Sequence, residues 1–311
     1  MTIGDKKRPI VWLITDNKPG HKNQLKGLAD RLGARARMRF LWIETRQYPV
    51  SWRQAILGQA PEIGQSSPDI MVAAGSRAQK LLLACRKRYH AMTVVLMRPA
   101  LPFAKPDLSI IPAHDNPPDR QDVLVTRGVL NAITPQRQTV EAHKSLILLG
   151  GPSGHFEWDN DDILRQVNIL AGEYPDWHWK VTSSRRTPTD LLEKLNRLHH
   201  DNMIFYHHEQ TGPDWLSETL AETRATWVSP DSVSMVYEAL TAGTLTGLLH
   251  LRPRHNSRVV RGLESLKTDG FVSEWKERAQ LMQKEANQSQ PLWEADRAAK
   301  WLIEKFREFP R

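Results

Sequence analysis

The stretch TWVSPDSVSMVYEALTAG, residues 226–243, carries the pattern on which the predicted fold depends. Its first three residues are apolar and β-prone, and they predict a buried strand. A Ser-Pro-Asp turn follows, and then a short helix that begins near Ser232 and that Gly243 can end. In a parallel sheet, Ser229, Asp231, Ser232 and Ser234 would lie at the carboxyl edge of the strand. The free N–H groups of the helix can bind an anion there.

Local sequence leaves two interpretations of this stretch open. In the first, Ser232 and Ser234 donate hydrogen bonds to phosphate oxygens, and Glu238, one turn further along, accepts from ribose hydroxyls. In the second, Asp231 or Ser232 is an ordinary helix cap and Glu238 is solvated. The rest of the chain has to decide between them.

Strand and helix patterns alternate along the whole chain, which predicts an α/β fold with parallel sheets. Strands are expected at 10–15, 39–43, 69–74, 93–97, 108–111, 123–126, 145–149, 177–182, 203–206, 226–228 and 245–251. Helices are expected at 21–32, 51–57, 76–88, 163–172, 189–198, 215–222, 232–243, 258–266 and 293–309. The polar segment 128–144 indicates a boundary between two domains, 1–140 and 141–311. The last helix is amphipathic and is a candidate to pack back on the first domain.

Length, composition and charge limit the kinds of protein that this chain can be. A chain of 311 residues suits two domains, and no apolar run reaches the ~18 residues of a membrane helix. The single cysteine, Cys85, excludes an internal disulfide, fits a reducing cytosol, and lies on an apolar helical face typical of a buried thiol. A net charge of +8 favours nucleotides or anionic lipid as partners. Nucleic acid is the weaker choice because no aromatic RNA-binding signature or zinc-finger spacing is present.

Glycines and polar side chains follow the predicted strands, at the edge where ligands collect in doubly wound sheets. GGPSGHF (150–156) resembles a phosphate-contacting loop in which Gly150 and Gly151 let the backbone approach a ligand and Ser153 adds a hydroxyl. The loop is neither G-x-G-x-x-G nor Walker A, so it indicates neither NAD binding nor ATP hydrolysis.

SSRRTP (183–188) places Ser184, Arg185 and Arg186 at another strand end. Hydroxyls beside planar guanidinium groups suit a diphosphate. The alternative is a basic loop in which a threonine caps the next helix. The serines favour the phosphate interpretation because they add donors beside the charge.

Two candidate residues for acid–base chemistry follow the first strand. His21 can take a proton from a hydroxyl at neutral pH, and Asp16 can orient it. The alternative is a turn capped by Asp16 and a helix that starts at His21. Further candidates are His114, His207 and Glu209. Adjacent histidines on a strand point in opposite directions, so no metal shared by His207 and His208 is expected.

Several motifs together resemble the mitochondrial-fission (elongated-mitochondria) protein family, which has many bacterial members. They are TDNKPGHKNQ, SPDIMVAAGSRAQ, PDLSIIPAHD, VLVTRG, LLGGPSGHF, TSSRRTP, WVSPDSVSMVYEA and RGLESLKTDGFV. The family resembles GT-B glycosyltransferases, in which two Rossmann-like, doubly wound domains face a central cleft that holds a nucleotide-sugar. The resemblance implies that PGH (19–21) faces the acceptor and that YEALTAG (237–243) holds the nucleotide. The usual Gly-x-Pro after that helix is replaced here by Gly243-Thr244-Leu245.

This resemblance implies a glycosyltransferase that moves a sugar from a nucleotide-diphosphate sugar to a hydroxyl acceptor. The expected acceptor is lipid-linked or of the lipopolysaccharide type, which would place a cytoplasmic protein at the inner membrane surface. In this hypothesis Arg185, Arg186, Ser232 and Ser234 neutralise the diphosphate. Glu238 binds the ribose, His21 acts as base, and neither a metal nor a cofactor is required. The alternatives are a nucleotide-sugar epimerase and a non-catalytic adaptor.

Overall fold

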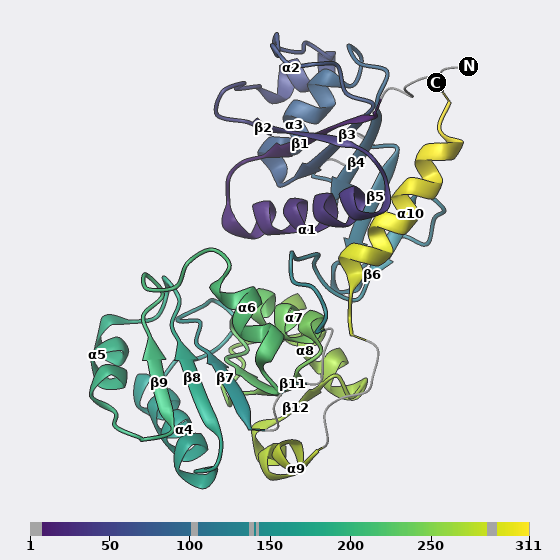
Figure 1. The fold of residues 1–311 in the computed structure, drawn as a ribbon. Coiled ribbons are helices and arrows are strands. Elements are labelled where there is room, and N and C mark those ends of the chain that lie inside the picture. Colours follow the sequence, from purple (N-terminus) through teal and green to yellow (C-terminus); the bar gives the residue numbers. More distant parts are fainter. Residues whose placement is uncertain (1–7, 101–104, 137–139, 141–142, 285–290, 311) are drawn as a thin grey trace. The chain divides into compact units, whose positions relative to one another are not determined.

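The computed structural model describes residues 8–100, 105–136, 140, 143–284 and 291–310, which form two compact units. Unit 1 contains Met1–Ala132 together with Glu294–Arg311, and unit 2 contains Ile133–Trp293 (Figure 1). Each unit is built on a parallel sheet of six strands with helices around it, so the predicted α/β fold of two doubly wound domains is confirmed.

The sheet of unit 1 has the strand order β2-β1-β3-β4-β5-β6. Its strands are β1 (Ile10–Thr15), β2 (Arg39–Glu44), β3 (Ile70–Ala74), β4 (Met92–Leu96), β5 (Leu108–Pro112) and β6 (Val123–Thr126). Its helices are α1 (Pro19–Arg35), α2 (Trp52–Leu57), α3 (Ser76–Cys85), the 3-10 turn η1 (Ala113–Asp115) and α10 (Glu294–Glu308).

Alternating side chains of β1 divide the core of unit 1 into two layers. Val11 and Leu13 pack in one layer with apolar residues of α1 and α10. Trp12 and Ile14 pack in the other, with residues of α3 that include Cys85. Burial raises the pKa of the Cys85 thiol to about 12, which confirms an inert buried thiol.

The sheet of unit 2 has the strand order β12-β11-β10-β7-β8-β9. Its strands are β7 (Lys144–Leu148), β8 (His178–Thr182), β9 (Met203–Tyr206), β10 (Ala225–Val228), β11 (Leu245–Leu248) and β12 (Val272–Ser273). Its helices are α4 (Asn160–Glu173), α5 (Thr189–Arg197), α6 (Trp215–Glu222), α7 (Val233–Ala242), α8 (Arg258–Thr268), the 3-10 turn η2 (Trp275–Glu277) and α9 (Arg278–Gln283). β12, η2 and α9 were not predicted. β11 ends three residues earlier than expected because the N–H of His250 donates to the side chain of Gln166.

The chain passes from unit 1 to unit 2 between Ala132 and Ile133, whereas the sequence places the boundary at 140/141. The N–H of Ala132 donates to Asn23 Oδ1 of α1, which fixes the last residue of unit 1. Gln136 already belongs to unit 2, since its Nε2 donates to the carbonyls of Leu220 and Thr223.

Helix α10 returns to unit 1, where it packs along α1. Asp296 of α10 accepts hydrogen bonds from Arg31 Nε at 3.0 Å and from Arg35 Nε and Nη2 at 2.8 and 2.6 Å. Burial opposes ionisation of Asp296, but these arginines and Lys300 outweigh it and lower its pKa to about 2. Among the described residues, none of the helices has the length and hydropathy of a membrane span.

Candidate functional site

The end of β1 and the start of α1 bring Asp16 and His21 together in unit 1. Asp16 follows β1 directly, and Pro19 opens α1, so His21 lies in the first turn of the helix. His21 Nδ1 lies 2.8 Å from Asp16 Oδ1, and the backbone N–H of Lys18 donates to the same oxygen at 3.2 Å. The turn therefore orients the imidazole through a carboxylate five residues earlier in the chain.

A glycine at the end of β3 completes this arrangement. Gly75 has a φ of +92°, and a Cβ built on it would lie 2.5 Å from two atoms of the His21 ring and 3.1 Å from Asp16 Oδ2. Both the backbone angle and the close approach require glycine. The sequence placed Gly75 at this edge but gave it no role; its contact with His21 is visible only in the structure.

The electrostatics of the pair favour an ionised Asp16. Burial would raise the pKa of Asp16, but the hydrogen bonds from His21 and from the N–H of Lys18 outweigh it and leave the pKa below its ordinary value. With a proton on Nδ1 directed at the carboxylate, His21 presents Nε2 as an acceptor. That is the arrangement of an oriented general base.

His114 lies elsewhere on the edge of the same sheet. It is part of η1, after β5, and β3 and β4 separate β5 from β1. Three strand spacings correspond to roughly 14 Å, so His114 is not a direct neighbour of the Asp16–His21 pair. Between them, Arg98 at the end of β4 donates from Nη1 to the carbonyl of Asp115.

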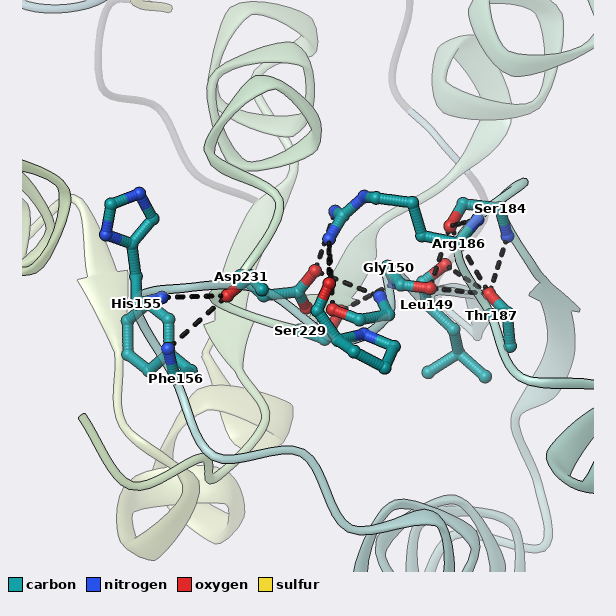
Figure 2. A network of polar contacts seen from close by, with 12 residues as sticks. Leu149, Gly150, His155, Phe156, Ser184, Arg186, Thr187, Ser229 and Asp231 are labelled. Atoms are coloured by element: carbon teal, nitrogen blue, oxygen red, sulfur yellow. Dashed lines mark hydrogen bonds and ion pairs between the residues drawn. The ribbon is translucent and has the colours of Figure 1, made fainter. Parts of the chain in front are cut away.

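The second group of candidate residues gathers in unit 2, where the neighbouring strands β8, β7 and β10 each end in a polar loop. Figure 2 shows these loops joined by hydrogen bonds. We call them the polar cluster, which consists of Gly150, Gly151, Ser184, Arg186, Thr187, Ser229 and Asp231.

Hydroxyl groups hold the first part of the polar cluster. The carbonyl of Gly150 accepts from Ser184 Oγ at 2.7 Å and from Thr187 Oγ1 at 2.5 Å. The N–H of Gly150 donates to Ser229 Oγ at 2.7 Å. The β7 loop is therefore bonded to the β8 loop through its carbonyl and to the β10 loop through its amide.

An ion pair holds the second part. Arg186 Nη2 donates to Asp231 Oδ2 at 2.7 Å, and the N–H of Gly151 donates to the same oxygen at 3.0 Å. Arg186 Nη1 donates to the carbonyls of Gly151 and Pro152. The side chain of Asp231 is only 1% exposed, whereas that of Arg186 is 43% exposed, so the pair is half-buried.

Burial raises the pKa of Asp231 above its ordinary value, although the Gly151 N–H, the Ser229 hydroxyl and Arg186 each act to lower it. The two glycines permit this packing. A Cβ on Gly150 would lie 2.1 Å from Asp231 Oδ2, and a Cβ on Gly151 would lie 2.1 Å from the carbonyl oxygen of Arg186.

These contacts change the roles expected from the sequence. The N–H groups of Gly150 and Gly151, expected to approach a phosphate, donate instead to Ser229 and Asp231. Arg186 is paired with Asp231, so its charge is largely neutralised within the chain. Arg185 is exposed and makes no hydrogen bond or ion pair within the described part of the chain, so its guanidinium is available to a ligand.

Helix α7 begins beside the polar cluster. Its N-cap residue Ser232 makes no side-chain capping bond, and Ser234 in its first turn is exposed. Asp231 points at Gly151 and Arg186, and Glu238 is buried at 9% exposure. The interpretation in which Asp231 or Ser232 caps the helix and Glu238 is solvated is therefore wrong. The side chain of Ser232 does not bond to the first amides of α7.

Ser153 shapes the loop after β7. Its Oγ accepts from the N–H groups of His155 and Phe156 at 3.2 and 3.3 Å. The hydroxyl expected to contact a ligand is thus engaged in a local turn.

His207 and Glu209 follow β9, the edge strand, and His207 Nδ1 lies 3.7 Å from Glu209 Oε2. The expectation that His207 and His208 point in opposite directions is wrong. Both residues lie beyond the end of β9, and their ring centroids are 4.3 Å apart. His208 Nδ1 lies 3.3 Å from Ser183 Oγ. Within the described ranges, no group of three or more His, Cys, Asp or Glu residues is arranged to hold a metal.

Three residues of these sites had no site role in the sequence analysis, although each lies at a predicted strand end: Gly75, Thr187 and Ser229. Each had a signal, since each lies in a loop that follows a predicted strand. Their hydrogen-bond partners and close contacts lie on other strands, and such pairing is set by tertiary structure.

The comparisons with known proteins agree with this architecture. The family model described as mitochondrial fission ELM1 matches residues 19–306. Among curated proteins, no sequence matches the chain.

The solved structures that resemble the chain share its fold, an α/β fold of two domains that is GT-B-like. A putative UDP-N-acetylglucosamine 2-epimerase from Listeria monocytogenes has a TM-score of 0.63 at 15% identity, with 98% of each chain covered. The UDP-GlcNAc 2-epimerase from Neisseria meningitidis bound to UDP-GlcNAc has a TM-score of 0.57 at 11% identity, covering 96% of this chain and 99% of the other. The spinosyn forosaminyltransferase SpnP has a TM-score of 0.54 at 14% identity, covering 97% and 96%.

Proposed function

The chain belongs to the mitochondrial fission ELM1 family, and from this premise we propose that it is a GT-B glycosyltransferase that uses a nucleotide-diphosphate sugar. The observation that carries the proposal is Arg185 of unit 2, which is exposed and has no hydrogen-bond or ion-pair partner among the described residues. The next residue of its loop, Arg186, is bonded to Asp231, which lies two residues before α7 begins. An exposed guanidinium, the amides of a helix start without a side-chain cap, the exposed hydroxyl of Ser234 and the half-buried hydroxyl of Ser232 are donors that suit a diphosphate.

The residues of unit 2 have two different roles in this proposal. Arg185, Ser232, Ser234 and the first amides of α7 bind the diphosphate, and Glu238 accepts from the ribose. The polar cluster, with its Arg186–Asp231 pair, positions these groups and does not contact the donor. This division departs from the sequence hypothesis, in which both arginines neutralise the phosphate.

Unit 1 supplies the base. His21 Nε2 removes the proton of an acceptor hydroxyl as the oxygen attacks the anomeric carbon of the sugar. The bond between that carbon and the diphosphate oxygen breaks, and the nucleoside diphosphate leaves with the bonding electrons. Asp16 holds the imidazole in orientation and stabilises the imidazolium that forms. We propose an acceptor of the lipid-linked or lipopolysaccharide type, used at the cytoplasmic face of the inner membrane.

A second candidate is a nucleotide-sugar epimerase, which the resemblance to two UDP-GlcNAc 2-epimerases favours. It shares the donor site of unit 2. It differs in requiring no acceptor, because the sugar itself loses and regains a proton.

Incubation with a panel of nucleotide-sugars separates the candidates. Binding is followed by thermal shift, and products are identified by mass spectrometry and NMR. Transfer that requires an added hydroxyl acceptor supports the glycosyltransferase, and an isomerised sugar without acceptor supports the epimerase. Failure to bind any nucleotide-sugar contradicts both and supports an adaptor without catalysis.

Replacement of Arg185 by alanine tests the donor site directly. Loss of one charge-assisted contact is expected to weaken nucleotide binding by about tenfold or more without lowering the melting temperature. Arg197→Ala is the matched control, since Arg197 is exposed on α5 and pairs only with Glu193 at 3.7 Å among the described residues. Equal affinities of the two variants would refute the role of Arg185.

A further inference from the structure

Helix α2 of unit 1 carries its large apolar side chains on the outside. Trp52, Ile56 and Leu57 are 37%, 52% and 50% exposed, and the one buried residue of the helix is the small Ala55. A capping box at Ser51 and Gln54 fixes the start of this short helix, and Gly58 ends it with a φ of +72°. The helix is thus held firmly while it exposes the side chains that a core would normally bury.

Basic residues are concentrated in the segments that form this part of unit 1. Helix α2 packs against α3 (Figure 1), and the segments 45–60 and 76–90 contain two and five Lys or Arg residues and no Asp or Glu. Arg86 pairs with Asp107 at 3.3 Å. Arg46, Arg53 and Arg77 make no ion pair or hydrogen bond with any described residue, so their charges face solvent. The face is therefore both apolar and strongly positive.

A hollow of about 240 Å³ is lined by residues 45–50 and by the first turns of α3. Three cations, Arg46, Arg77 and Lys80, line it together with Tyr48. Lys80 Nζ also lies 5.5 Å from the centre of the Trp52 ring, which connects the hollow to the apolar side chains. A concave site of this size with three cations can accept an anionic group such as a phosphate.

We propose that the face formed by α2, α3 and residues 45–50 binds the surface of an anionic bilayer, with a lipid phosphate in this hollow. Tryptophan is typical of the headgroup level, and exposed Ile and Leu side chains gain free energy by leaving water for the acyl region. Cations beside them are attracted by the negative surface potential. The aliphatic side chains favour lipid over nucleic acid, because a nucleic acid backbone offers the cations a partner but covers no aliphatic surface.

The proposal depends on unit 1 alone and not on the nucleotide-sugar chemistry. It locates a membrane contact that the net charge of the chain indicates only in general terms. Vesicle binding is measured without nucleotide-sugar, so failure of one proposal leaves the other standing.

The test is cosedimentation of the full chain with phosphatidylcholine vesicles, with and without phosphatidylglycerol. The basic variant is Arg46→Gln/Arg53→Gln/Arg77→Gln, and the apolar variant is Trp52→Ser/Ile56→Ser/Leu57→Ser. Each cation near an anionic surface changes partitioning by about fivefold, so the basic variant is expected to bind about a hundredfold more weakly. The apolar variant is expected to bind at least tenfold more weakly. Circular dichroism and melting temperature establish that both variants are folded.

The control variant Val125→Ser/Ile204→Ser removes two other exposed apolar side chains and is expected to bind as the wild type does. The proposal is overturned if the wild type binds neutral and anionic vesicles equally, or if neither the basic nor the apolar variant loses binding. It is also overturned if duplex DNA or RNA competes fully with vesicles and the apolar variant binds it normally. Full competition by inorganic phosphate, compared with sodium chloride at equal ionic strength, would instead assign the hollow to a soluble phosphate.

Discussion

Replacement of Gly151 by alanine probes the polar cluster at its tightest contact. A Cβ there would lie 2.1 Å from the carbonyl oxygen of Arg186, where real Cβ atoms approach no closer than 3.0 Å. The β7 and β8 loops must therefore separate by about 0.9 Å, because the nearest atoms belong to the backbone and cannot rotate away.

The cost follows from the bonds that cross between these loops. Ser184 and Thr187 donate to the Gly150 carbonyl at 2.7 and 2.5 Å, and Arg186 Nη1 donates to the Gly151 carbonyl at 3.0 Å. A separation of about 0.9 Å takes most of these distances beyond hydrogen-bonding range. Overpacking of about 1–3 kcal/mol and the loss of one or two bonds of about 1 kcal/mol each give about 3 kcal/mol.

Hydrogen exchange followed by mass spectrometry measures this cost locally, which suits a chain of two units that need not unfold in one step. Amides of 144–157 and 178–187 are expected to exchange about a hundredfold faster in Gly151→Ala, and the affinity for nucleotide is expected to fall. Gly154→Ala is the matched control in the same loop, since no atom lies within 4 Å of its added Cβ. If both variants exchange as the wild type does, the polar cluster does not hold these loops together.

Three further predictions concern single residues. Asp296→Asn is expected to lower the unfolding free energy by about 2 kcal/mol at pH 7, from a pKa of about 2 against 3.8. This contribution of Asp296 to the unfolding free energy is present above pH 4 and is lost as the pH falls toward 2. The unfolding free energy measured with urea should therefore differ less between pH 7 and pH 3 in the variant than in the wild type. Gly75→Ala places a Cβ 2.5 Å from the His21 ring, so it should displace the imidazole and change the NMR chemical shifts of the ring, which Gly20→Ala, with open space around its Cβ, should not. The pKa of Asp231 is higher in the folded protein than in the unfolded chain. The folded state is therefore destabilised relative to the unfolded state as the pH rises from the unfolded to the folded pKa of this carboxyl. Asp231→Asn should remove this loss in urea unfolding over the weakly acidic range, and an unchanged pH profile would refute the assignment.

Short apolar runs with clear ends explain why much of the fold could be predicted. The strands Ile10–Thr15, Val123–Thr126 and Met203–Tyr206 have the predicted bounds, because each is a short β-prone run between polar or turn residues. β12 was not predicted because a strand of two residues is too short to show an alternation of apolar and polar side chains. The return of α10 to unit 1 was expected from its amphipathic pattern, but its pairing of Asp296 with Arg35 was not, because these residues lie far apart in the sequence.

The candidate site was predictable only as a set of loops. The rule that parallel strands present their carboxyl ends at one edge gathers Arg186 and Asp231 into neighbouring loops. It does not tell whether an arginine pairs with a carboxylate of its own chain or with a ligand, since both partners are oxyanions of similar geometry. The distinction between Arg186 and Arg185 therefore needed the structure.

The placement of α10 has a consequence for how the chain is made. Ribosomes release the strands of unit 1 first, yet the helix that covers one layer of its core is encoded after all of unit 2. At roughly 5–20 residues per second, the intervening stretch of about 160 residues takes on the order of ten to thirty seconds to translate. During that interval the apolar surface that α10 later covers is left open on the nascent polypeptide, while unit 2 can fold as soon as it emerges. Unit 2, which is translated later, can thus finish folding before unit 1. A chaperone that binds nascent chains would therefore bind the exposed apolar surface of unit 1.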